Sequence, residues 1–203
     1  MKKLVYILMM TLLVVACKSS EEKVDSLIGE NIERAQPSIK KGSFELVETR
    51  IDSAYAPNDD PAVLMRMDEV ADLQRELDAC NYDIELSRQR IKSRDRELAS
   101  GALSPFHKAQ FEDAEEDYNR SLKQRDELKE KIESKLQVIK ELLQAKREFV
   151  GYKALATYRY ENSMGDHVGN SYFIIDPHRR SVLYVTDKTT YERYQAVFKD
   201  LED

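Results

Sequence analysis

The chain has 203 residues, of which 34% are charged, and it contains six Gly, five Pro and no Trp. So few glycines and prolines argue against an all-β sandwich and against a large α/β enzyme with glycine-rich loops, and the length allows one or two domains. The 32 basic and 38 acidic residues give a formal net charge of −6, which excludes the basic excess of a general nucleic-acid binder.

The N-terminal residues predict a secretory signal that ends in a lipid-attachment site. Residues 1–3 are Met-Lys-Lys, and residues 4–15 form an apolar run that is too short to span ~30 Å of hydrocarbon. The run ends in Val14–Val15–Ala16–Cys17, which resembles a bacterial lipobox. The resemblance implies removal of residues 1–16 and acylation of Cys17. Several acyl chains on one residue would anchor the protein stably in a membrane.

Residues 17–23 are polar after the lipid-attachment site and are expected to form a flexible lipidated tether. Lys18 stands where an inner-membrane retention signal would have Asp, so we expect an outer-membrane location on either the periplasmic or the surface face. The acidic pair Glu21–Glu22 resembles the surface-export tether of Bacteroidetes lipoproteins, and it is equally compatible with a solvated spacer. With Cys17 acylated, Cys80 is the remaining thiol, and its place on an apolar helical face suits a small buried hydrophobe.

The next elements in the chain are a short helix and a strand. Residues 24–36 carry Leu27, Ile28 and Ile32 on one side of a predicted helix. Residues 43–54 are rich in β-branched and aromatic residues and predict a strand, with a bulge where the alternation slips between Leu46 and Val47. Residues 55–61 form a turn cluster in which Asp60 suits the N-cap and Pro61 the first position of a helix.

Two long helices follow the turn. Over residues 61–99, apolar side chains recur at strict intervals of seven, at Val63, Val70, Leu77, Ile84, Ile91 and Leu98. A second helical pattern covers residues 105–148, after a break at Gly101 and Pro105. Because the connection is short, the pair should form an antiparallel two-helix coiled-coil hairpin, each helix about 60 Å long. Residues 61–149 hold 20 acidic and 17 basic residues, as expected for solvated outer faces.

The C-terminal part predicts three strands and a helix. The strands are expected at residues 149–161, 167–176 and 181–186, and a capping box of Thr189 and Glu192 starts the helix, which runs to Leu201. The early strand should join these three, since an isolated strand cannot satisfy its backbone. We therefore predict an α+β fold: a small antiparallel sheet of about four strands with flanking helices, formed by residues 24–60 and 150–203, with the hairpin of residues 61–149 inserted.

Several segments resemble uncharacterised envelope lipoproteins of Bacteroidetes. The segments are Ile51–Asp52–Ser53–Ala54–Tyr55–Ala56–Pro57, Asp59–Asp60–Pro61, Phe149–Val150–Gly151–Tyr152–Lys153 and Tyr158–Arg159–Tyr160–Glu161–Asn162. The resemblance implies the same architecture and an envelope address, and it implies no activity. The arrangement also looks like that of the Skp-type periplasmic holdase chaperones. Their hairpins are basic, however, whereas this one is balanced in charge.

Two groups of residues are candidate binding sites. Asp52, Asp59 and Asp60 lie close together in sequence and could bind a cation or act in acid–base chemistry, although turn and capping roles also explain them. Tyr152, Tyr158 and Tyr160 share one face of a predicted strand and could bind a glycan or peptide, although packing under a helix also explains them. The three His residues, His107, His167 and His178, lack metal-ligand spacing, so no metal or cofactor is expected.

These patterns favour a non-catalytic protein over an enzyme, because no nucleophile elbow, phosphate loop or triad pattern is present. We expect a lipid-anchored envelope protein with a structural, scaffold or partner-interaction role. It would reach the membrane through Cys17 and a protein partner or a second copy through residues 61–149, without binding nucleic acid. The alternatives are a Skp-like holdase and a glycan- or peptide-binding lipoprotein.

Overall fold

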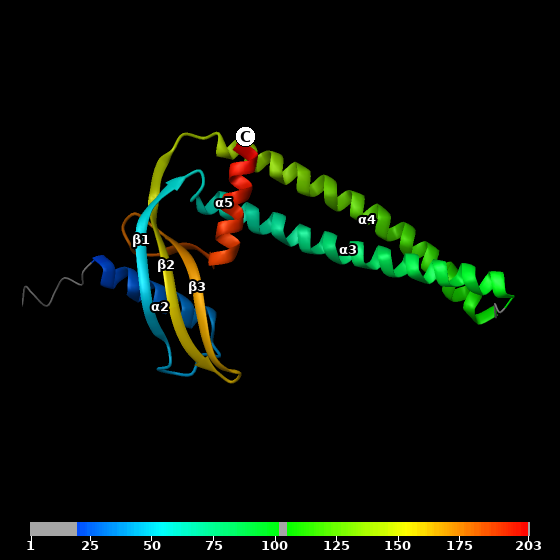
Figure 1. The fold of residues 1–203 in the computed structure, drawn as a ribbon. Helices are drawn as coiled ribbons and strands as arrows, with labels where there is room; N and C mark the ends of the chain where they lie inside the picture. Colours follow the sequence, from blue (N-terminus) through cyan, green and yellow to red (C-terminus); the bar gives the residue numbers. More distant parts are fainter. Residues whose placement is uncertain (1–19, 102–104, 203) are drawn as a thin grey trace, which may run out of the picture. The chain divides into compact units, whose positions relative to one another are not determined.

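The computed structural model describes residues 20–101 and 105–202 (Figure 1). In chain order the elements are α2 (Ser20–Ala35), β1 (Glu45–Ala56), α3 (Pro61–Ser100), α4 (Pro105–Leu143), β2 (Glu148–Asn162), β3 (Gly165–Ile175), β4 (Val182–Asp187) and α5 (Lys188–Glu202). They form two compact units. The sheet unit comprises the described residues up to Leu64 and from Leu143 onward, and the hairpin unit comprises Met65–Leu142. These junctions differ by a few residues from the predicted ones at 61 and 149.

The predicted α+β fold is confirmed. In the described residues, the four strands form one antiparallel sheet in the order β1-β2-β3-β4, so the early strand joins the three late ones. The predicted bulge is also present, because Leu46 pairs with Tyr158 while Glu48 pairs with the adjacent Thr157. Val47 is therefore the extra residue that twists the start of β1.

A second bulge, which was not predicted, lies where β1 ends and β2 begins. Ala54 pairs with Gly151, whereas Tyr55 pairs with Phe149, so Val150 is the extra residue. Gly151 has a φ of 145°, and a Cβ atom there would lie 2.0 Å from the carbonyl oxygen of Ile175. Only glycine fits so close a backbone approach, and a glycine inside a strand often marks a bulge.

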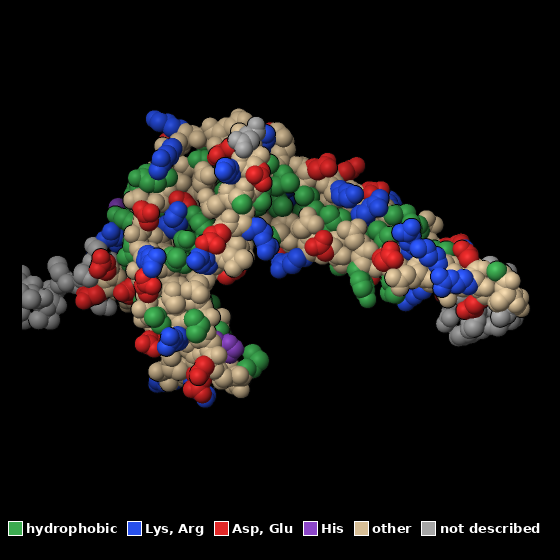
Figure 2. Space-filling view, viewed as in Figure 1, with side chains coloured by type: hydrophobic (Ala, Val, Ile, Leu, Met, Phe, Trp, Pro, Cys, Tyr) green, Lys and Arg blue, Asp and Glu red, His purple; other side chains and the backbone are tan. Residues whose placement is uncertain are grey.

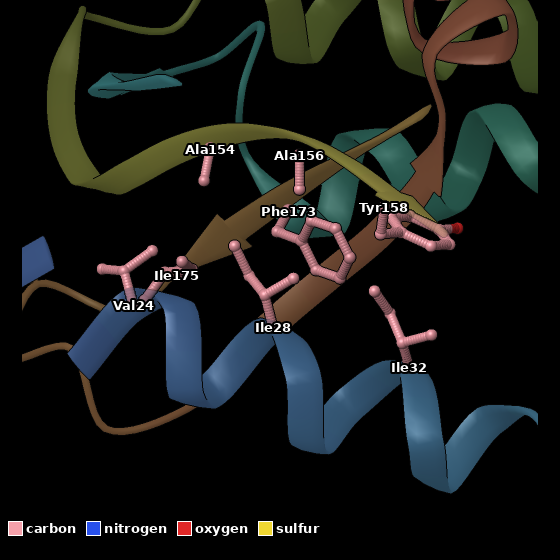
Figure 3. Close-up of a cluster of buried hydrophobic side chains, with 8 residues drawn as sticks. All are labelled: Val24, Ile28, Ile32, Ala154, Ala156, Tyr158, Phe173 and Ile175. Carbon is pink, nitrogen blue, oxygen red and sulfur yellow. The ribbon is translucent and has the colours of Figure 1, made fainter. Parts of the chain in front are cut away.

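Helix α2 packs its apolar stripe against one face of the sheet (Figure 3). Its buried side chains Val24, Ile28 and Ile32 are spaced by four residues and so lie on one side of the helix. The sheet contributes Ala154, Ala156, Tyr158, Phe173 and Ile175. Full burial of each large apolar side chain contributes about 1.5–3 kcal/mol, so this layer is a main source of the sheet unit's stability.

Helix α5 packs on strands β3 and β4 through Tyr191, Tyr194 and Phe198. Tyr172 of β3 stacks on Tyr191, and because strand side chains alternate, it lies on the face opposite Phe173. The sheet is therefore covered by α2 on one face and by α5 on the other.

The N-cap of α5 was wrongly assigned from the sequence. Asp187 caps the helix, because its Oδ1 accepts a hydrogen bond of 2.9 Å from the backbone N–H of Thr190. Partial burial alone would raise the pKa of Asp187, but hydrogen bonds from Thr190 and Thr189 outweigh it and lower that pKa. The predicted capping box at Thr189 fails because β4 runs directly into the helix, which leaves Thr189 inside the first turn.

Three predicted boundaries are also corrected. Residues 20–23 of the predicted tether belong to α2, whose acidic first turn, Glu21 and Glu22, favours a helix N-terminus; residues 17–19 lie outside the described part. Tyr55 and Ala56 extend β1 instead of starting the turn. Helix α4 ends at Leu143, five residues before the predicted end, and β2 starts at Glu148.

The hairpin unit buries the predicted heptad residues Val70 and Leu77, whereas Ile84 and Ile91 are only half-buried. Val70, Leu77 and Cys80 of α3 are buried, as are Ala114, Leu128, Ile132 and Ile139 of α4; the side chain of Leu98 lies outside the described part. Ion pairs join the two helices at Lys135–Glu69 and at Arg94–Glu115, in the order that an antiparallel pair requires. Acidic and basic side chains are interspersed along α3 and α4 (Figure 2).

Candidate functional site

The structure separates the three predicted aspartates. Asp52 is exposed on β1 and accepts a hydrogen bond of 2.8 Å from the backbone N–H of Ser53. Asp60 caps α3 through a hydrogen bond of 2.8 Å from the N–H of Ala62, as the capping interpretation predicted. Only Asp59 is buried, so the carboxylates do not converge on a shared cation or on a pair suited to acid–base catalysis.

Asp59 belongs instead to a buried polar cluster with Lys153 of β2 and Tyr191 of α5, here called the Asp59 cluster. The Lys153 ammonium lies 3.1 and 3.3 Å from the two carboxylate oxygens and 3.1 Å from the Tyr191 hydroxyl oxygen. The Tyr191 hydroxyl donates to Oδ1 of Asp59. Oδ2 of Asp59 also accepts the backbone N–H of Tyr55 at 3.0 Å, so both carboxylate oxygens are engaged within the protein.

Electrostatics keep the Tyr191 phenol protonated. Burial raises the pKa of Tyr191 strongly, and the neighbouring Asp59 carboxylate adds to the shift because it accepts the phenol proton and repels a phenolate. Tyr191 therefore acts as a hydrogen-bond donor and not as a base. Since the carboxylate, ammonium and phenol satisfy one another, the arrangement holds the β1–α3 turn against the sheet and α5.

Sequence reasoning singled out Asp59 but missed Lys153 and Tyr191 as its partners. Lys153 is only 24% exposed at its side chain, although it stands in a strand with an alternating pattern. Tyr191 lies on the apolar face of α5 with Tyr194 and Phe198. A lysine on a sheet face that a Tyr-bearing helix covers was the available signal that a buried carboxylate is needed nearby.

The three predicted tyrosines have different surroundings. Tyr158 is buried under α2, with its hydroxyl 3.1 Å from Oγ of Ser171 and its ring over Gly169, where a Cβ would lie 2.4 Å from the ring. Tyr160 is partly buried and stacks between Tyr158 and His167. The proposed exposed ligand surface is therefore corrected for Tyr158, which is a core residue. Tyr152 lies nearer the N-terminal end of α2, where it is partly exposed.

Among the residues that the structure describes, no group of three or more His, Cys, Asp or Glu side chains is positioned to hold a metal ion. Cys80 is buried with its Sγ 3.0 Å from the carbonyl oxygen of Ser121, and burial raises the pKa of its thiol. Cys17 and residues 1–16, which carry the lipidation prediction, lie outside the described part. No helix within the described ranges is long and apolar enough to cross a membrane.

Comparison of the chain with known protein families, curated proteins and solved structures found no match.

Proposed function

We propose that the chain is a lipid-anchored envelope protein with a non-catalytic role, in which the sheet unit is held at the membrane and the hairpin unit binds a protein partner. The single observation that carries the anchor is the sequence Val14–Val15–Ala16–Cys17 after a basic start and an apolar run. A non-catalytic role is supported by the Asp59 cluster, whose polar groups bind one another.

The start of α2 sharpens the anchoring proposal. Only Lys18 and Ser19 separate Cys17 from Ser20, the first residue of α2. Three residue steps span at most roughly 10 Å, so an acyl group on Cys17 would hold the sheet unit close to the bilayer surface. The role assigned to residues 17–23 as a spacer is therefore reduced to two or three residues.

Partner binding by the hairpin unit is supported by apolar side chains outside its seam. Tyr82 is 70% exposed, and Leu86, one helical turn along α3, is also exposed. On α4, Val138 and Leu142 form a similar exposed pair. Since a solvated helix face is normally polar, these pairs are suited to a second helix, whether from another protein or from a second copy.

Acylation of Cys17 is the first prediction. When the full chain is expressed in a Gram-negative bacterium fed an alkyne fatty acid, the purified protein should carry the label, and Cys17→Ser should abolish it. Cys80→Ser is the matched control and should be labelled like the wild type, because that thiol is buried in the hairpin unit. An unlabelled wild type, or a label that persists in Cys17→Ser, would contradict the anchoring proposal.

Self-association through the hairpin unit is the second prediction. In sedimentation velocity, the chain beginning at Lys18 should show a sedimentation coefficient that rises with concentration. The double substitution Tyr82→Ser with Leu86→Ser should increase the dissociation constant of self-association at least tenfold, which corresponds to about 1.4 kcal/mol. The sedimentation coefficient should then rise only at higher concentrations. Met164→Ser, at an exposed position of the sheet unit, should leave it unchanged. If the chain is a monomer at every concentration, self-association is contradicted, and the partner of the hairpin unit would have to be a different protein.

A further inference from the structure

Five side chains of the sheet unit form a continuous row of contacts, here called the Arg–aromatic ladder: Arg147, Tyr55, Phe149, Tyr152 and Arg179. The guanidinium carbon Cζ of Arg147 lies 4.2 Å from the centroid of the Tyr55 ring, and Cζ of Arg179 lies 4.1 Å from the centroid of the Tyr152 ring. Between them, Phe149 contacts Tyr55 edge-on at 6.0 Å between ring centroids and Tyr152 at 5.5 Å. The row therefore has a guanidinium at each end and three rings in the middle.

The unpredicted bulge at Val150 creates this row. In a regular strand Phe149 and Tyr152, three residues apart, would point to opposite faces of the sheet. Phe149 pairs with Tyr55 and Tyr152 pairs with Ser53, and residues 53 and 55 share a face of β1. The extra residue thus brings both rings to the face that α2 covers further along.

The ladder is only partly covered. Its central ring, Phe149, is 46% exposed, and Arg147 is exposed as well. On the same face, burial under α2 begins at Val24, which lies against Ile175 (Figure 3). The apolar ring of Phe149, with a tyrosine and then a guanidinium group on each side, is thus left open at the end of the face where α2 begins.

The turn between β3 and β4 fixes the second guanidinium. The carboxylate of Asp176 accepts backbone N–H groups from His178 at 3.0 Å, from Arg180 at 2.6 Å and from Ser181 at 2.6 Å. Within this turn Arg179 adopts a positive φ of 56°, which a non-glycine residue rarely does. The Nε atom of Arg179 is buried and has no hydrogen-bond partner among the described residues. The turn therefore fixes the backbone of Arg179, whose guanidinium lies over Tyr152.

The ladder lies beside the first turn of α2, a few residues after the predicted anchor in the sequence. Glu21, in the first turn of α2, lines one hollow together with Tyr152 and Arg179. Cys17 is four residues before Glu21, a distance of at most roughly 14 Å along an extended chain. Acyl chains on Cys17 would therefore enter the bilayer within reach of the ladder.

We propose that the Arg–aromatic ladder is the membrane-contact surface of the sheet unit, and that its occupant is the headgroup layer of the bilayer that receives the Cys17 acyl chains. This inference rests on the proposed lipid anchor. Aromatic rings with polar neighbours favour the boundary between headgroups and acyl chains. Arginine binds phosphate through paired hydrogen bonds while its stem stays on apolar surface. The ladder offers these two chemistries in one row.

Acidic side chains near the two arginines weaken their attraction to an anionic bilayer. Glu21 and Asp52 line the same hollow as Arg179, and Glu148 is exposed beside Arg147. These carboxylates offset the two guanidinium charges, so a purely electrostatic attraction to an anionic surface would be weak. The insertion of Phe149 is therefore the step that distinguishes a membrane contact from general charge attraction.

The absence of Trp from the natural sequence permits a direct test. Full-length acylated Phe149→Trp is reconstituted into vesicles of phosphatidylethanolamine and phosphatidylglycerol, in which part of the phospholipid is brominated near the headgroup end of its acyl chains. We expect the Trp emission maximum of this variant to shift to shorter wavelength when the protein is in vesicles, and most of the emission intensity to be lost when the lipid is brominated. The matched control is Met164→Trp, at an exposed position of the same unit, whose emission should be unchanged by bromine.

Each outcome separates the two proposals. If the reconstituted protein floats with the vesicles but Phe149→Trp is not quenched, the ladder does not contact lipid and this inference is overturned, while the anchor stands. If the protein fails to float with the vesicles, both proposals are overturned. Equal quenching of Phe149→Trp and Met164→Trp would also overturn the inference, because it would indicate contact that is not specific to the ladder.

Discussion

Asp59→Ala is expected to lower the free energy of unfolding of the sheet unit by about 3 kcal/mol, because removing one partner of a buried ion pair leaves the other charge uncompensated. Lys153 would keep an ammonium group on a covered sheet face, Tyr191 would lose the acceptor for its hydroxyl, and the N–H of Tyr55 would lose its partner. The measurement is urea unfolding followed by near-ultraviolet circular dichroism, which reports on the tyrosines concentrated in this unit.

Asp52→Ala is the matched control for Asp59→Ala. Asp52 lies on β1, seven residues before Asp59, but it is exposed, so its removal should change the free energy of unfolding by no more than about 0.5 kcal/mol. Asp60→Ala removes a helix cap and should cost about 1 kcal/mol. If the three substitutions lower the free energy of unfolding equally, the Asp59 cluster does not stabilise the sheet unit more than an ordinary surface or capping aspartate does.

The hairpin could be predicted from the sequence because its signals are local. The interval of seven from Val63 onward specifies one buried stripe, and the short break near Gly101 makes the two helices neighbours. The four-stranded sheet followed from a different argument. An unpaired strand at residues 43–54 would leave its backbone unsatisfied, and the three later strands offered the only sheet to join.

The Asp59 cluster could not be predicted because its members come from distant parts of the chain. Lys153 is 94 residues from Asp59 and Tyr191 is 132 residues from it. Each residue has an ordinary local explanation: a turn aspartate, a solvated strand lysine and an amphipathic helix tyrosine. Their convergence depends on the packing of α5 on the sheet, which periodicity alone does not specify.

The Arg–aromatic ladder could not be predicted from the sequence for a related reason. Strict alternation places Tyr152, Tyr158 and Tyr160 on one face, and this assignment led to a predicted binding surface. The same alternation places Phe149 on the other face, so its contact with Tyr152 was not foreseen. A bulge of one residue reverses the assignment for everything before it, and the sequence signal for that bulge was Gly151, a glycine inside an otherwise regular strand.

Gly151→Ala should therefore be among the most damaging single substitutions in the sheet unit, with an expected loss of at least about 3 kcal/mol in the free energy of unfolding. Its φ of 145° disfavours any side chain, and the new Cβ would meet the backbone of Ile175, which cannot move without separating β2 from β3. Urea unfolding measures the loss.

Gly165→Ala separates the two causes of this loss. Gly165 also has a positive φ, of 117°, but a Cβ there meets nothing within 4 Å, so backbone strain alone should cost about 1 kcal/mol. If Gly151→Ala were no worse than Gly165→Ala, the close approach to Ile175 would not constrain the bulge. Because the bulge sets the face on which Phe149 lies, its relaxation should also remove the quenching of Phe149→Trp by brominated lipid. The backbone geometry at one glycine thus links the stability of the sheet unit to its proposed contact with the membrane.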